Sequence, residues 1–137
     1  MTFTRCTDPP PAGLLAGIDL FNQREFFDCH EILEDIWRAD RDPVRLLYQG
    51  ILQIGVGFYH LGNGNWRGAV ALMTRGIDKV ERFGTRCMGV ETARLVDEAW
   101  RCLSLLQRLG PERIGEFDWS LVPVIVVQRG AGEPETR

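Results

Sequence analysis

Apolar residues recur at intervals of three and four positions along most of this chain, which is the spacing of amphipathic α-helices. This pattern, together with the breaks between its segments, predicts five helices, over residues 12–21, 23–38, 43–61, 66–83 and 90–109. Helices of this length joined by short links pack side by side. The sequence therefore predicts an all-α fold, a compact helical bundle of about five helices.

Start and stop signals sharpen these boundaries. Asn22 stands three residues before Glu25, which is the spacing of a capping box at the start of the second helix. Asp42 and the proline after it mark the start of the third helix, and Asn65 is a favourable cap for the fourth. Gly110 and the proline that follows end the fifth.

The pattern changes after residue 110. Residues 121–127 are apolar and rich in β-branched side chains, but Pro123 has no amide donor and argues against a central strand. We expect an extended apolar C-terminal arm laid over the bundle or over a neighbouring subunit, with packing on its own domain the commoner arrangement. Residues 1–137 then form a single helical domain, with a core at about 14–110 and an arm over 111–137, whose last residues fray.

Composition and charge narrow the function classes. The net charge of −3 gives no reason to expect a nucleic-acid partner. The longest apolar run, Leu46–Leu61, is interrupted by polar residues, so no membrane span is expected. Residues 1–11 lack the basic start and apolar run of a signal peptide, which predicts a cytoplasmic protein.

Four cysteines, Cys6, Cys29, Cys87 and Cys102, are present and none belongs to a C-x-x-C pair. In the cytoplasm we expect all four to be reduced thiols. Cys29 and Cys102 fall on apolar helix faces, where they act as small buried hydrophobes.

The second predicted helix carries a polar pair on its apolar side. His30 and Glu34 are one helical turn apart and lie between Phe26, Phe27 and Trp37 on the helical wheel. An imidazole and a carboxylate at this spacing can reach each other. Because buried ionisable groups are costly unless they are paired, we expect the two side chains to interact.

The third predicted helix repeats the arrangement. Gln49, Gln53 and His60 share one narrow stripe, while the rest of the helix is apolar nearly all round, which is typical of a central, buried helix. The short link between the two helices makes them antiparallel. Their polar stripes can then face each other inside the bundle, giving a cluster of five polar side chains.

Three roles fit this cluster. His30, Glu34 and His60 are a two-histidine, one-carboxylate set that suits a divalent metal such as zinc or iron, with Gln49 and Gln53 as supporting partners. His30 and Glu34 are also catalytic candidates for general acid–base chemistry. Alternatively, the cluster is a structural hydrogen-bond network. The sequence is not a metalloprotease, since position 34 lacks the second histidine of H-E-x-x-H.

Other residues extend the candidate binding site. Trp37 could stack on a planar ligand, and Arg45, one of three arginines near the link between the second and third helices, could bind an anion, although packing and a solvated rim are the commoner roles. A non-enzymatic interaction module is the alternative to a small-molecule site. The apolar circumference of the third helix and the apolar arm suggest a homodimer.

Two blocks of residues together resemble the family called domain of unknown function 309. They are Phe21-Asn22, Phe26-Phe27, His30-Glu31, Leu33-Glu34 and Trp37-Arg38, followed by Arg45, Gln49-Gly50, Gln53, Tyr59-His60, Gly62-Asn63 and Gly68-Ala69. The resemblance covers residues 14–83. It implies a compact α-helical bundle of the kind found in small prokaryotic proteins. The family has no established activity, so it implies no catalytic role for any residue.

Overall fold

A computed structural model of the chain describes residues 3–128, and in that span the chain folds into five α-helices and three short 3-10 helices. The α-helices are α1 (Ala12–Asn22), α2 (Phe26–Ala39), α3 (Arg45–Gly62), α4 (Trp66–Val80) and α5 (Thr92–Leu109). The 3-10 helices are η1 (Glu81–Phe83), η2 (Pro111–Glu116) and η3 (Trp119–Leu121). The prediction of an all-α fold is confirmed. In the described part of the chain, no helix has the length and apolar character needed to cross a membrane.

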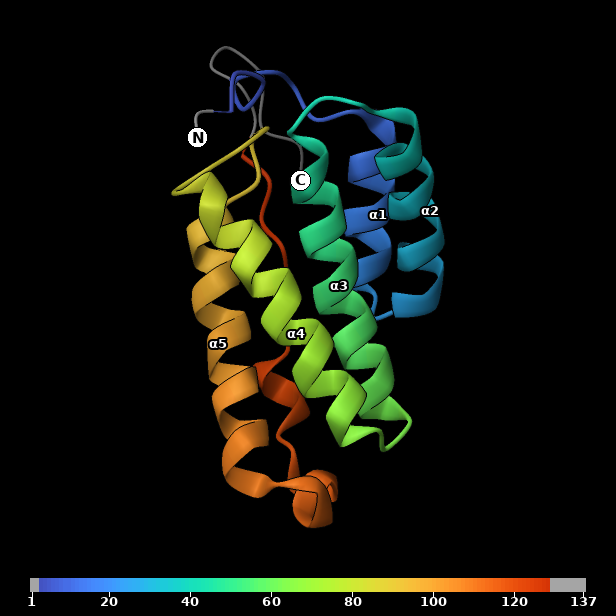
Figure 1. Cartoon of the computed structure of the whole chain (residues 1–137), viewed down its shortest axis with the longest axis vertical. Helices are drawn as coiled ribbons and strands as arrows, with labels where there is room; N and C mark the ends of the chain where they lie inside the picture. Colours follow the sequence, from blue (N-terminus) through green and yellow to red (C-terminus); the bar gives the residue numbers. More distant parts are fainter. Residues whose placement is uncertain (1–2, 129–137) are drawn as a thin grey trace.

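Each helix packs on the next one along the chain, and α3 stands between α2 and α4 (Figure 1). The backbones of α3 and α4 approach closely where glycines face each other. A Cβ atom added to Gly76 would lie 2.6 Å from the carbonyl oxygen of Gly50, and one added to Gly57 would lie 2.6 Å from Met73. Because glycine has no side chain, the two backbones can approach closely, and the α3–α4 contact is the most extensive in the bundle.

Two of the predicted caps are observed and one is not. The Asn65 side chain accepts a hydrogen bond from the amide of Gly68 at the start of α4, and Asp42 accepts one from the amide of Val44 just before α3. The prediction that Asn22 caps α2 is wrong. Asn22 is the last residue of α1, and its side-chain amide forms a pair of hydrogen bonds with the backbone of Ile125, 103 residues away.

The C-terminal arm returns along the bundle from the end of α5 (Figure 1). After η3 it is extended, and backbone hydrogen bonds join Glu91 to Val126 and Gln128 to Gly89. Val122 and Ile125 are buried. The arm therefore packs on its own chain, the commoner of the two predicted arrangements. The predicted fraying of the last residues lies outside the described residues.

The prediction of four reduced thiols is wrong for two of them. Cys6 and Cys87 are joined by a disulfide that closes a loop between positions 81 residues apart. Sequence spacing could not indicate this pair, because only the fold brings the N-terminal segment to the turn before α5. Cys29 and Cys102 are free and buried, as predicted.

Candidate functional site

His30 and Glu34 form the predicted pair on α2. The Nε2 atom of His30 lies 3.1 Å from a carboxylate oxygen of Glu34, and the guanidinium of Arg38 donates a hydrogen bond of 2.5 Å to the other oxygen. All three side chains point from one face of α2 because they are spaced by four residues. Their exposed fractions of 34%, 29% and 68% show that this face meets solvent.

The polar stripe of α3 lies on the outward side of that helix. Gln49, Gln53 and His60 are half-buried, while the opposite sides of α3 bury apolar residues against α1, α2 and α4. The sequence predicted that this stripe faces the polar stripe of α2 inside the bundle, whereas these side chains are half-buried at the edge of the core. The Oε1 atom of Gln53 is shielded from solvent and has no hydrogen-bond partner, so the stripe holds one free acceptor.

Two aromatic rings separate the histidines. The ring centroids of His30 and Phe27 are 6.3 Å apart, those of Phe27 and Tyr59 are 5.7 Å apart, and those of Tyr59 and His60 are 6.2 Å apart. Phe27 and Tyr59 are 53% and 41% exposed. The side chains thus form a continuous strip along α2 and α3 in which the imidazoles stand at opposite ends.

The predicted metal ligands His30, Glu34 and His60 do not come together in the described residues. Within residues 3–128, no group of three His, Cys, Asp or Glu side chains is placed to hold a metal ion, so His30, Glu34 and His60 do not form a three-ligand set. The physical reason is the register of the antiparallel pair. His60 comes near the end of α3, beyond the start of α2, and its ring contacts Asn65 (Nδ2 to Nδ1, 3.4 Å) and packs over Gly68 at the start of α4.

Trp37 and Arg45, both named as binding candidates, interact with each other across the α2–α3 link. The guanidinium carbon of Arg45 lies 4.1 Å from the centroid of the Trp37 ring, and its Nε donates a hydrogen bond of 3.0 Å to the Trp37 carbonyl. A ring and a cation already in contact stabilise the turn. Their geometry supports the packing role.

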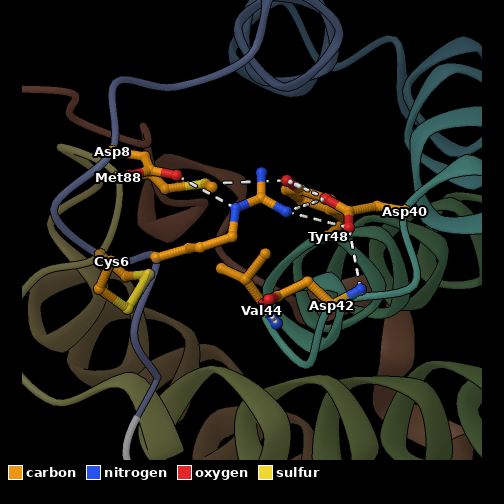
Figure 2. A network of polar contacts seen from close by, with 9 residues as sticks. Cys6, Asp8, Asp40, Asp42, Val44, Tyr48 and Met88 are labelled. Carbon is orange, nitrogen blue, oxygen red and sulfur yellow. Dashed lines mark hydrogen bonds and ion pairs between the residues drawn. A yellow bond between two sulfur atoms is a disulfide. The ribbon is translucent and has the colours of Figure 1, made fainter.

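Sequence analysis missed a second polar cluster, which lies under the N-terminal segment (Figure 2). The guanidinium of Arg5 donates to both carboxylate oxygens of Asp40 at 2.9 and 3.1 Å and to Asp8 at 3.1 Å. The hydroxyl of Tyr48 donates to Asp40 at 3.3 Å. Tyr48 is 1% exposed, so this cluster is more deeply buried than the His30–Glu34 pair.

Burial and charge shift the pKa values of this second cluster. Burial raises the pKa of the Tyr48 phenol to about 12, and the Asp40 carboxylate beside it adds to the shift. Burial also pushes the pKa of Asp40 upward, but the hydrogen bonds from the Asp42 amide and the Arg5 guanidinium outweigh it, and the pKa lies below its ordinary value. The only sequence signal was the pair of opposite charges at Arg5 and Asp8 in the lead-in, which is too weak to find the cluster.

Two surface hollows lie elsewhere, along α5. One, of about 460 Å³, is lined by Thr85, Arg86, Glu91, Ala93, Arg94, Asp97, Glu98 and Arg101. The other, of about 880 Å³, is lined by Trp100, Arg101, Ser104, Gln107, Arg108 and Leu121. Neither contains any residue of the α2–α3 strip.

Comparison with known proteins shows that the strip lies within the residues matched by a family model. The family model described as domain of unknown function (DUF309) matches residues 14–72. The uncharacterized protein YpuF of Bacillus subtilis (strain 168) is 32% identical over 91 residues, which cover 64% of this chain and 52% of that protein. The chain thus spans about half the length of this relative. No solved structure matches the chain. The segment from residue 14 to residue 72, which carries most of α1, all of α2 and α3 and the start of α4, is thus the part of the chain that is similar to the DUF309 family.

Proposed function

We propose that the protein is a non-enzymatic interaction module whose outward α2–α3 face binds a second copy of the same chain. The observation that carries the proposal is the exposed pair of rings, Phe27 and Tyr59, held 5.7 Å apart between half-buried polar side chains. Aromatic anchors surrounded by a polar rim are typical of protein interfaces.

The exposure of the strip favours a macromolecule over a small molecule. Small ligands bind in hollows that bury most of their surface, whereas the His30 and Glu34 side chains lie on an open helix face. A flat partner surface could cover both rings at once.

The charges of α2 support a copy of the same chain as the partner. The face that carries Phe27 has Glu31 and Glu34 in its middle, and Arg38 and Arg41 follow at its end. Two copies related by a two-fold axis perpendicular to α2 would place these helices antiparallel, so that the acidic part of each meets the basic end of the other. Each pair of rings would then be covered by the other copy.

Sedimentation equilibrium of the full chain tests the proposal. We expect a dimer that the double variant Phe27→Ala, Tyr59→Ala weakens about thirtyfold or more, since anchor residues at interfaces contribute at least about 2 kcal/mol each. Trp100→Ala is the matched control, because Trp100 is 43% exposed on α5, outside the strip. A monomer at all concentrations, or a dimer that the double variant leaves unchanged, would overturn the proposal.

A charge reversal tests the antiparallel arrangement separately. Glu31→Arg should weaken the dimer, and adding Arg41→Glu should restore part of the affinity.

Location in the cytoplasm stays a prediction of the sequence.

A further inference from the structure

The disulfide joins a lightly attached segment to a firmly held turn. On one side, Cys6 is half-buried in residues 3–8, which touch the bundle through few groups. On the other, Cys87 is fully buried, and hydrogen bonds of 3.1 and 2.8 Å join its backbone to that of Val90. The next residues are fixed by the arm, through the pairing of Val90 with Val127 and the Gln128–Gly89 hydrogen bond of 2.7 Å. Breaking the disulfide would therefore free one side only.

The contacts that remain on the N-terminal side are few. They are the ion pair of Arg5 with Asp40, the stacking of Phe3 on Phe83 with ring centroids 4.1 Å apart, and the hydrogen bond of 2.7 Å from the Met88 amide to the Cys6 carbonyl. The Arg5 side chain is 34% exposed, so solvent screens part of its attraction to Asp40. The disulfide is the strongest single connection of this segment to the bundle.

We propose that Cys6–Cys87 is a reversible redox latch, in which reduction by a cellular dithiol releases residues 3–8 from the bundle and uncovers Asp40 and Tyr48. This role is independent of the α2–α3 face. The thiol–disulfide exchange site is the Cys6–Cys87 pair at the end of the bundle where the N-terminal segment lies (Figure 2), and residues 3–8 are the segment that moves.

The exchange balances with a dithiol as the co-reactant. Its thiolate attacks the Sγ atom of Cys6, the more accessible of the two sulfurs, and a mixed disulfide forms while Cys87 leaves as a thiolate and takes up a proton. The second thiol of the reductant then displaces Cys6, which also ends as a thiol. Two electrons and two protons pass to the protein, and the reductant becomes a disulfide.

The other cysteines do not interfere with this pair. Burial raises the pKa values of Cys29 and Cys102 to about 12. Since the thiolate is the attacking species, neither side chain can exchange with the disulfide at neutral pH. Oxidation and reduction are thus confined to Cys6 and Cys87.

Hydrogen exchange on the full chain, before and after reduction with dithiothreitol, tests the latch. We expect the Met88 amide, which donates to the Cys6 carbonyl, and the amides of residues 3–8 to exchange about tenfold faster or more after reduction, because the disulfide no longer restricts their local opening. Trypsin should then cut after Arg5. The amides of α3 should keep their protection.

The variant Cys6→Ser provides the matched control. It should show the fast exchange without reductant, and dithiothreitol should change it no further. Unchanged exchange at Met88 and residues 3–8 in reduced wild-type protein would overturn the proposal. So would a disulfide that dithiothreitol reduces only when the helices unfold, since that result identifies a permanent staple.

Discussion

The two polar clusters of this protein use similar residue types but connect very different parts of the chain. The His30–Glu34–Arg38 cluster lies within one helix at steps of four residues and meets solvent. The Arg5–Asp40–Tyr48 cluster joins three segments, spans 35 residues in sequence between Arg5 and Asp40, and covers a buried phenol. The first is easy to find in a sequence because it lies within one helix. The second is hidden in a sequence and ties the N-terminal segment to the bundle.

The largest expected effect concerns the disulfide above the second cluster. Reduction, or the double variant Cys6→Ser, Cys87→Ser, should lower the free energy of unfolding by about 3–5 kcal/mol, because the unfolded chain loses a closed loop between positions 81 residues apart. Urea denaturation with and without reductant measures this. The double variant should be insensitive to reductant. A loss below about 1 kcal/mol would show that the N-terminal segment is a minor part of the fold.

A matched pair of carboxylate variants compares the clusters directly. Asp40→Ala should cost about 2–3 kcal/mol, since it leaves the Tyr48 hydroxyl and the Arg5 guanidinium without their shared partner. Glu34→Ala should cost about 0.5 kcal/mol, since exposed ion pairs one turn apart contribute little. Chemical denaturation of both variants is the measurement. Equal losses would mean that the exposed cluster is a structural centre after all.

The pH dependence of stability should reveal the second cluster at both extremes. The pKa of Asp40 is lowered in the folded state, so its contribution is complete above its ordinary value and is lost as the pH falls through the folded pKa. The pKa of Tyr48 is raised to about 12, so stability decreases as the pH rises from about 10 to about 12, where only the unfolded chain loses the proton. Tyr48→Phe should abolish the alkaline change, and Tyr59→Phe, the control on the exposed strip, should keep it.

The smallest expected effect is in salt. The stabilisation lost in Glu34→Ala should disappear in about 1 M NaCl, where charges are screened within about 3 Å. Part of the loss in Asp40→Ala should persist, because the buried Tyr48 hydroxyl has lost its hydrogen-bond partner. Melting temperatures of both variants at low and high salt measure the difference. A salt-independent loss in Glu34→Ala would place that carboxylate in a less exposed setting than the structure gives it.

Local signals carried most of the fold prediction. The helical spacing of apolar residues, the Asn65 cap and the stop at Gly110 act within a few residues, and each appears in the structure. The His30–Glu34 contact was predictable for the same reason. The capping prediction for Asn22 was wrong because it rested on local spacing alone. The Asn22 side chain instead forms hydrogen bonds with the backbone of Ile125, which is distant in sequence.

The class of fold, the positions of the helices and the His30–Glu34 contact could be predicted from the sequence, because they depend on periodicity and on neighbours one turn apart. Three features could not be predicted and are seen only in the structure. His30 and His60 lie at opposite ends of the strip. Cys6 forms a disulfide with Cys87, and Asp40 lies between Arg5 and Tyr48. These pairings depend on how the helices are aligned and on where chain ends return. Such distances are fixed by packing of the whole bundle and leave no mark in residue spacing.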